Sequence, residues 1–318
     1  MSVAILGLAA YPKNRVWPKV ELLVRSARSR SPRTPVALLT TPLGDIDRRL
    51  FRRFGVEAIE CVDPPPRPDA DRAASAKRHW EWFLEFCCRR YALYREVIEG
   101  RDESHFLLTD TRDAIVTAPL GDQIAESRLV LSQEHATTGI AANDLNRKWM
   151  VVGYGEAELA AVATRPILCC GTLFGSRQSV VAYLIAMSDE AHRIGAETLQ
   201  RIGDQPLLAH LAYSGKLPEY TISTAEDGWM RSIGIMPLEE IRIDWEQRHG
   251  TNAEKTPCVI VHQYDRHLQS RLVRQSVARL ACLPWWHRWP IQKYVQYDSG
   301  VAATMLRAFV KTCILRSS

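Results

Sequence analysis

The sequence predicts an α/β fold in which helices cover both faces of a largely parallel sheet, because strand-like and helix-like patterns alternate along its first half. Residues 2–9 and 35–40 are continuous apolar runs of the length of a buried strand. Between them, apolar residues recur at helical spacing over residues 17–27. Strands that alternate with amphipathic helices are typical of a parallel, helix-covered sheet. The 318 residues suffice for one large domain or two modest ones.

The alternation continues as far as residue 110. Residues 45–54 predict a second helix, which Asp45 caps, and residues 56–62 predict a third strand that ends before three prolines. A long amphipathic helix over about residues 74–99 leads into a fourth strand, residues 105–109, which ends at Asp110. Ligands of such sheets bind beyond the carboxyl ends of the strands, so Asp110 lies where a ligand is expected.

The second half of the chain is less regular. Short apolar runs predict strands at residues 128–132, 149–152, 166–170 and 256–262, and helices are expected at residues 176–193 and 204–213. After residue 266 the pattern indicates a helix, a break rich in Pro and Trp at 284–290, and a last amphipathic stretch. We therefore expect one domain, residues 1–267, followed by a helical C-terminal extension, residues 268–318.

The net charge of +5 is unevenly distributed. Residues 266–318 hold nine Lys and Arg against a single acid, Asp298, whereas the rest of the chain holds 32 bases and 35 acids. This distribution argues against a uniformly cationic nucleic-acid-binding protein. The extension combines three Trp with basic residues, which suits either an anionic membrane surface or packing against the domain.

Several other classes of protein are disfavoured by missing motifs. The eight cysteines include no C-x-x-C pair, so no zinc site is predicted, and several stand in apolar runs, as reduced core thiols do. The chain lacks the glycine-rich dinucleotide and phosphate-loop motifs and the G-x-S-x-G elbow. The first residues do not resemble a secretory signal, and no apolar stretch approaches about 18 residues. We expect a soluble, cytoplasmic protein.

The strongest local signal is the segment F-L-L-T-D-T-R-D, residues 106–113. It places Asp110, Arg112 and Asp113 at the end of an apolar strand, where unpartnered charges are costly to desolvate. Two carboxylates so close together suit Mg²⁺ or Mn²⁺, which bind protein carboxylates together with phosphate oxygens and water. The alternative is a capping turn with an internal Arg–Asp ion pair.

This segment resembles the acidic motif of the nucleotide-sugar glycosyltransferases of the GT-A fold, in the subgroup that has D-x-R-D in place of D-x-D. Three later segments resemble motifs of that family and follow in its order. They are C-C-G-T-L-F-G at 169–175, G-D-Q-P-L-L at 203–208 and V-H-Q-Y-D-R-H at 261–267. The resemblance covers residues 3–267. It implies a GT-A-like, Rossmann-like mixed sheet and a nucleoside-diphosphate-sugar donor.

The resemblance also implies a site for Mn²⁺ or Mg²⁺ that neutralises the leaving diphosphate. Asp113 and His262 would hold the ion, while Asp110 would either bind it or face the ribose or a metal-bound water. His267 is a weaker candidate ligand. Cys169 departs from the family pattern, because it stands where an Asn would contact the sugar.

Further residues receive roles through the same resemblance. Residues expected near the donor are Arg112, Lys77, Arg78, Gly171 and Gln205, although a solvated helix face suits Lys77 and Arg78 better and Arg112 would either stabilise the diphosphate or only orient Asp113. Asp204 is expected on the sugar side or as a helix N-cap. Glu134, just beyond the strand at 128–132, would serve as the base for the acceptor hydroxyl or is a plain surface residue.

The function expected from these features is a metal-dependent, hexosyltransferase-like glycosyltransferase. It would act on a glycan or lipid-linked acceptor in the synthesis of a surface or extracellular polysaccharide, and the extension would allow attachment to the inner face of a membrane. The stereochemistry, inverting or retaining, stays open. The alternatives are a catalytically lapsed protein that binds a nucleotide sugar or glycan, and a membrane-associated scaffold.

Overall fold

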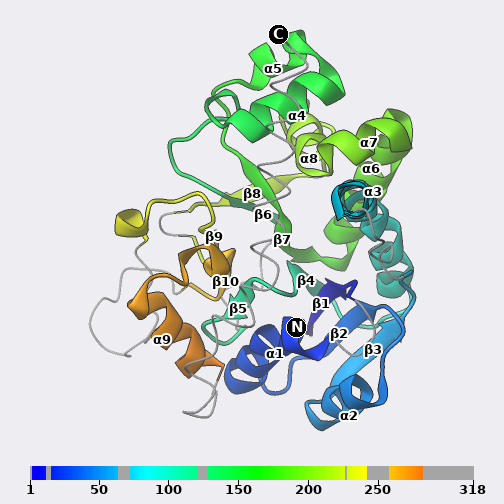
Figure 1. Ribbon diagram of the computed structural model, residues 1–318, viewed down its shortest axis with the longest axis vertical. Helices are drawn as coiled ribbons and strands as arrows, with labels where there is room; N and C mark the ends of the chain where they lie inside the picture. Colours follow the sequence, from blue (N-terminus) through cyan, green and yellow to red (C-terminus); the bar gives the residue numbers. More distant parts are fainter. Residues whose placement is uncertain are drawn as a thin grey trace.

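The computed structural model describes residues 2–11, 16–63, 72–120, 128–225, 228–241 and 258–281. Over these residues the chain is an α/β protein with a seven-stranded mixed sheet (Figure 1). The Pro/Trp-rich break and the last amphipathic stretch of the predicted extension lie outside the described residues. Within the described part, no helix has both the length and the apolar character needed to cross a membrane.

The large sheet has the strand order β3-β2-β1-β4-β7-β6-β8. Its first four strands are parallel, β7 runs antiparallel to both β4 and β6, and β8 is parallel to β6. The strands are β1 (Val3–Ala9), β2 (Val36–Thr40), β3 (Val56–Glu60), β4 (His105–Asp110), β6 (Leu129–Gln133), β7 (Leu168–Ser176) and β8 (Tyr220–Ser223). The predicted strands at 2–9, 35–40, 56–62 and 105–109 are thus confirmed.

A second sheet of three short strands has the order β5-β10-β9. These strands are β5 (Ala114–Val116), β9 (Met230–Ser232) and β10 (Ile260–His262). Strand β10 is antiparallel to β5 and parallel to β9. Because β5 begins directly after Asp113, this small sheet lies against the end of the predicted acidic motif.

Helices and the small sheet cover the two faces of the large sheet. Side chains alternate along β4, so that Phe106 and Leu108 pack with α3, α6, α7 and α8 while Leu107 packs with α1, α2 and the small sheet. These helices are α1 (Trp17–Arg30), α2 (Asp45–Arg53), α3 (Arg72–Glu99), α6 (Arg177–Ile194), α7 (Ala196–Ile202) and α8 (Gln205–Tyr213). Burial on both faces explains the continuous apolar runs of the central strands.

Two further helices, α4 (Asp144–Tyr154) and α5 (Glu156–Val162), pack with α8 and lie at one end of the molecule (Figure 1). The predicted strand at 149–152 is therefore wrong, because these residues belong to α4. Asn143 caps this helix by accepting a hydrogen bond from the backbone N–H of Asn146 at 3.1 Å. Four apolar residues in a row do not distinguish a strand from a helix turn. The N-cap at Asn143 is the feature that indicates a helix here.

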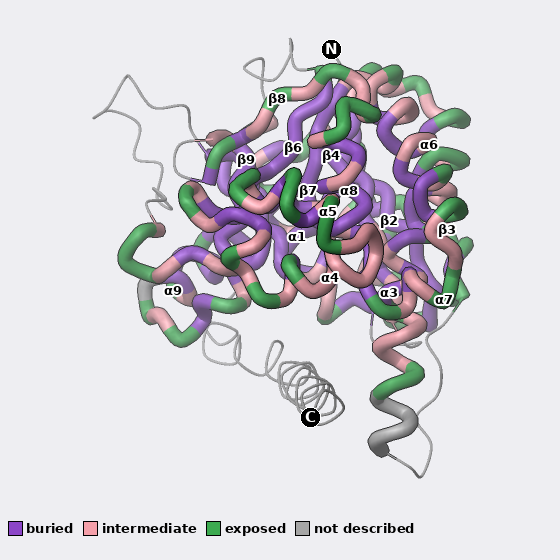
Figure 2. Tube along the Cα trace, turned by 90° about the horizontal axis from the view of Figure 1, so that it is seen from above, coloured by how far each residue is buried: buried purple, intermediate pink, exposed green. Residues whose placement is uncertain are grey.

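The last described helix is α9 (Arg271–Leu280), within the predicted extension. Its residues Val273 and Val277 are buried in one hydrophobic cluster with Ile115 of β5 and Val261 of β10. The described part of the extension therefore shares a core with the small sheet. At the other side, the N-terminal part of α3 projects from the buried body of the molecule (Figure 2).

Candidate functional site

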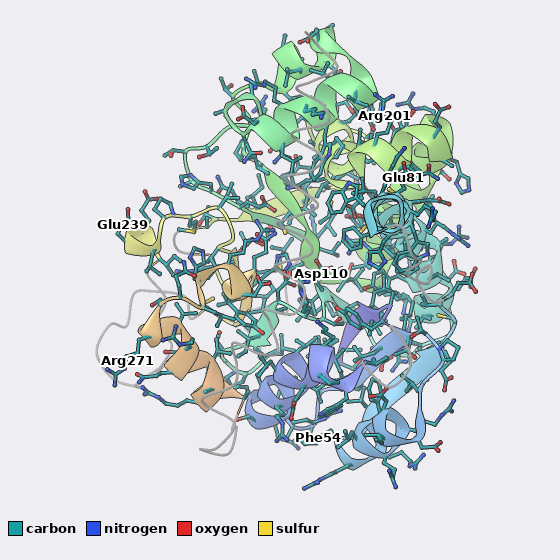
Figure 3. The ribbon with its side chains drawn as sticks, in the orientation of Figure 1. Phe54, Glu81, Asp110, Arg201, Glu239 and Arg271 are labelled. Atoms are coloured by element: carbon teal, nitrogen blue, oxygen red, sulfur yellow. The ribbon has the colours of Figure 1, made fainter. Side chains whose placement is uncertain are left out.

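The candidate site lies at the carboxyl end of β4, a central strand of the large sheet. Asp110 is the last residue of this strand, and its carboxylate lies near the middle of the molecule (Figure 3). Its two oxygens have different neighbours. Oδ1 accepts a hydrogen bond from Nη1 of Arg90 at 2.8 Å, and Oδ2 lies 3.3 Å from Nε2 of His262. Asp110 is thus held on one side and faces a histidine on the other.

The small sheet brings Asp113 and His262 together although 149 positions separate them in the sequence. In the antiparallel pair of β5 and β10, His262 is opposite Ala114, the residue after Asp113. The backbone N–H of Gln263 donates to the carbonyl of Asp113 at 2.7 Å, with Gln263 in the left-handed region at φ 61°. Nε2 of His262 then lies 3.5 Å from Oδ1 of Asp113.

Asp110, Asp113 and His262 form a group that can hold a metal ion. One ligand atom from each residue lies within 4.8 Å of the others. Nε2 of His262 is buried and has no hydrogen-bond partner among the described residues. Two carboxylate oxygens and one imidazole nitrogen suit Mn²⁺ and Zn²⁺, and carboxylates suit Mg²⁺ as well.

Gly171 of β7 has no side chain, so the space in front of these three candidate ligands stays free. A Cβ atom at residue 171 would overlap the imidazole of His262 and would come within 2.7 Å of Oδ2 of Asp110. Only glycine therefore fits between the two ligands. These residues fit a small ion, because Nε2 of His262 has no hydrogen-bond partner among the described residues and lies beside the space that Gly171 leaves without a side chain.

The electrostatics of the triad follow from burial and from close opposite charges. Burial opposes ionisation of Asp113, but the charge of His262 beside it holds the Asp113 pKa well below 3.8. For Asp110, burial is likewise outweighed by Arg90 and His262, so its pKa is lowered. Burial would lower the His262 pKa, yet Cys169 and the two carboxylates raise it well above 6.5. In the metal-free chain, the imidazolium thus compensates the carboxylates.

Arg90 of α3 extends the site toward Asp204. Its guanidinium is buried and donates to Asp110 at 2.8 Å, to Asp204 at 2.7 Å and to the carbonyl of Cys170 at 2.9 Å. Tyr91 donates to the same oxygen of Asp204 at 2.8 Å. Asp204 precedes α8 but its side chain makes no capping hydrogen bond, so its carboxylate serves the arginine and the tyrosine instead.

The sequence did not single out Arg90. One pattern in the sequence does indicate that Arg90 is buried. Arg90 lies on the same helix face as the buried aromatic residues Phe86 and Tyr94, which stand four residues before and after it. Buried arginines are rare unless paired, so this position predicts an acidic partner. The sequence could not say which acid, since Asp204 stands 114 positions away.

Arg112 faces Asp265 in the structure, and its charge also acts on Asp113. Its Nη2 lies 3.5 Å from Oδ2 of Asp265, and its carbonyl accepts from the hydroxyl of Tyr264 at 3.2 Å. About a third of its side chain is exposed, which leaves it accessible to a ligand. Tyr11, just after β1, was not foreseen. Burial raises its pKa to about 12, and Thr111 and Arg112 lie beside it.

Glu134 and Gln205 are two further residues close to Cys169. Glu134 follows β6 and is buried, and burial raises its pKa although Arg266, His262 and hydrogen bonds with Cys169 and Gln205 oppose the rise. Gln205 donates from its side chain to the carbonyl of Leu168 at 3.2 Å. The structure thus places Glu134 near His262, with Gln205 beside Glu134.

The remaining sequence candidates lie apart from the triad or serve the fold. Lys77 is exposed and pairs with Glu81 at 3.6 Å, and Arg78 is also exposed. Both stand 12 or 13 residues before Arg90 on α3, a separation of about 20 Å along the helix axis. His267 is buried and its Nε2 bonds the carbonyl of Ile233 at 2.7 Å. Because a carbonyl only accepts, that nitrogen carries a proton and is no metal ligand.

Comparison with known proteins adds no family to this geometry. No protein-family model matches the chain, and no curated protein matches it in sequence.

Proposed function

We propose that the chain is a metal-dependent glycosyltransferase of the GT-A type that transfers a sugar from a nucleoside-diphosphate sugar to a glycan or lipid-linked acceptor. The observation that carries the proposal is the meeting of Asp110, Asp113 and His262 in front of Gly171, at the carboxyl end of a central strand. This edge is where ligands of α/β sheets bind. The four motifs that resemble the GT-A family contribute residues to this one place.

The chemistry of the proposed reaction depends on a leaving diphosphate. A divalent cation, Mn²⁺ or Mg²⁺, would supply the charge neutralisation that departure of this group requires. Asp110, Asp113 and His262 would hold the cation, and Arg90 would keep Asp110 oriented toward it. Arg112, a third exposed and next to the triad in sequence, would meet the diphosphate oxygens.

Two carboxylates remain for the sugar and the acceptor. Asp204 joins the site through Arg90 and would bind donor hydroxyls. Glu134 would take the proton of the acceptor hydroxyl, and its raised pKa shifts it in the direction that a general base at neutral pH needs. The net charge of +8 over residues 266–318 favours an acceptor at an anionic membrane surface.

A specific observation favours a second candidate, a protein that binds a nucleotide sugar without transferring it. Asp204 and Glu134 are only 9% and 5% exposed, so neither proposed catalytic carboxylate faces open solvent. A lapsed enzyme on this fold would keep the metal triad and lose turnover.

One experiment separates the two candidates and tests the proposal. Thermal unfolding of the full chain is followed with UDP or GDP, each with and without Mn²⁺, and donor hydrolysis is screened across nucleotide sugars. Metal-dependent stabilisation together with hydrolysis supports the transferase. Stabilisation without hydrolysis of any donor supports the binding protein, and no metal-dependent shift with either nucleotide refutes both.

A further inference from the structure

His262 has neighbours on both ring nitrogens, and only one side faces the proposed cation. We infer that Cys169 is a positioning residue that fixes the protonation state of His262, so that Nε2 presents a lone pair to the ion. The inference rests on the proposed function, because it concerns the same metal triad. It assigns a role to a cysteine that departs from the family pattern.

The contacts of the imidazole define the problem. Nε2 faces Asp110 and Asp113 at 3.3 and 3.5 Å. Nδ1 lies 3.2 Å from Sγ of Cys169 and 3.1 Å from Oγ of Ser232. A neutral imidazole carries its proton on one nitrogen alone, so a metal at Nε2 requires the proton on Nδ1. Some neighbour of Nδ1 must therefore accept that proton.

Ser232 does not decide the tautomer by itself. Its hydroxyl either donates to or accepts from Nδ1, and it lies 3.1 Å from a second hydroxyl, that of Ser132. A hydroxyl that donates to Nδ1 would leave the proton on Nε2, which would block the metal. The serine pair alone is thus compatible with both tautomers.

The geometry points to Cys169 as the acceptor. Its sulfur already accepts the backbone N–H of Gly171 at 3.3 Å. Nδ1 of His262 lies 3.2 Å from the same sulfur, which offers a second lone pair to the Nδ1 proton. This arrangement selects the tautomer that protonates Nδ1 and frees Nε2.

The position of the sulfur indicates an indirect role. Sγ lies on the Nδ1 side of the ring and does not belong to the group of ligand atoms formed by the triad. Hydrogen bonds to the far nitrogen of a metal-bound histidine fix its orientation and raise its basicity, and their loss typically weakens metal affinity about 10–100-fold. Cys169 would support His262 in this way behind the ion.

The test measures Mn²⁺ binding by the full chain, by calorimetry or electron paramagnetic resonance. The variants are Cys169→Ala, which removes the acceptor, Cys169→Ser, which retains one, and Cys258→Ala as a control that removes another buried sulfur. We expect Cys169→Ala to weaken Mn²⁺ binding roughly 10–100-fold. Cys169→Ser should retain most of the affinity, and Cys258→Ala should match the wild type.

A second measurement reads the tautomer in the wild-type chain, where no variant has to fold. Nitrogen-15 spectra of the imidazole in the Mg²⁺-saturated protein should show the proton of His262 on Nδ1. A proton on Nε2 would overturn the inference. So would a sulfur-to-metal charge-transfer band with Cd²⁺ that Cys169→Ala alone removes, because the cysteine would then be a direct ligand.

The outcomes separate this inference from the proposed function. Wild-type protein that binds Mn²⁺, with Cys169→Ala binding it equally well, refutes the inference and leaves the metal site standing. Wild-type protein that binds neither Mn²⁺ nor Mg²⁺ refutes the proposed function and the inference together.

Discussion

Arg90 lies 2.7 Å from the carboxylate of Asp204 and 2.8 Å from that of Asp110, so one buried guanidinium joins two acids that are 94 residues apart in the sequence. The arginine also donates a hydrogen bond to the backbone carbonyl of Cys170 on β7. This single side chain therefore links helix α3 to the carboxyl end of β4, to the start of β7 and to the start of α8.

Arg90→Ala should destabilise the protein by about 3–5 kcal/mol, because it leaves a buried carboxylate without its compensating charge. Denaturant unfolding of the metal-free chain measures the effect. Arg95→Ala is the matched control on the same helix, since Arg95 is exposed and pairs with Glu99 along the helix surface. Equal unfolding midpoints for the two variants would contradict the role assigned to Arg90.

Gly171→Ala should abolish Mn²⁺ binding, because the added methyl group would occupy the space between His262 and Asp110. Gly100→Ala is the control, since a Cβ there would meet only a carbonyl at an ordinary 3.8 Å. Calorimetric titration with Mn²⁺ checks both variants. Unchanged binding by a folded Gly171→Ala protein would show that the ion does not lie between these ligands.

Asp113→Asn should remove metal-dependent stabilisation by a nucleoside diphosphate while the fold persists. The change keeps the shape of the side chain but withdraws the charge that a divalent cation requires. Asp144→Asn serves as the control, because Asp144 is exposed and pairs with Arg147 on α4. Thermal unfolding with UDP or GDP and Mn²⁺ provides the readout. A full shift in Asp113→Asn would mean that the metal site is misassigned.

Mn²⁺ affinity and metal-free stability should respond to pH in opposite directions above pH 6.5. The raised pKa of His262 stabilises the metal-free fold fully below its ordinary value of 6.5, and this stabilisation is lost as the pH rises through the raised pKa. The same deprotonation frees Nε2, so affinity should increase by up to about tenfold per pH unit until that pKa is passed. Asp113, whose pKa is lowered from 3.8, contributes stability above that value and loses it only in stronger acid.

Titrations with Mn²⁺ between about pH 6 and pH 8, paired with denaturant unfolding in the presence of a chelator, check both trends. An affinity that is independent of pH above 6.5 would show that His262 is already neutral in the free chain.

The sequence predicted the elements whose signals are local. The first four strands were readable because burial on both faces makes them continuous apolar runs, and Asp110 was readable as a strand end. The grouping of Asp110, Asp113 and His262 came from a motif resemblance, and the structure brings all three together. Strand β5, only three residues long, gave no pattern to recognise, although it sets the register that aligns Asp113 with His262.

What the sequence missed depends on distant partners. In the sequence, Arg90 is one of several charged residues on a long helix. Its partner Asp204, which precedes α8, is 114 positions away. Residues 149–152 read as a strand because four apolar residues carry too little periodicity, while the cap at Asn143 that makes them helical is a separate signal. Cys169 read as a departure from a sugar contact, whereas its sulfur contacts His262 and the backbone of Gly171 in the structure.

The pairing of β10 with β5 makes the metal triad a product of late chain synthesis. Asp110 and Asp113 are synthesised in about the first third of the chain, whereas His262 is synthesised much later. The pairing of His262 with Ala114 sets the direction of the imidazole. A slip of one residue would turn His262 to the other face of the small sheet. Until β10 docks, the two carboxylates lack the histidine of the proposed metal site, so metal binding by a nascent or truncated chain would report that β10 has paired with β5.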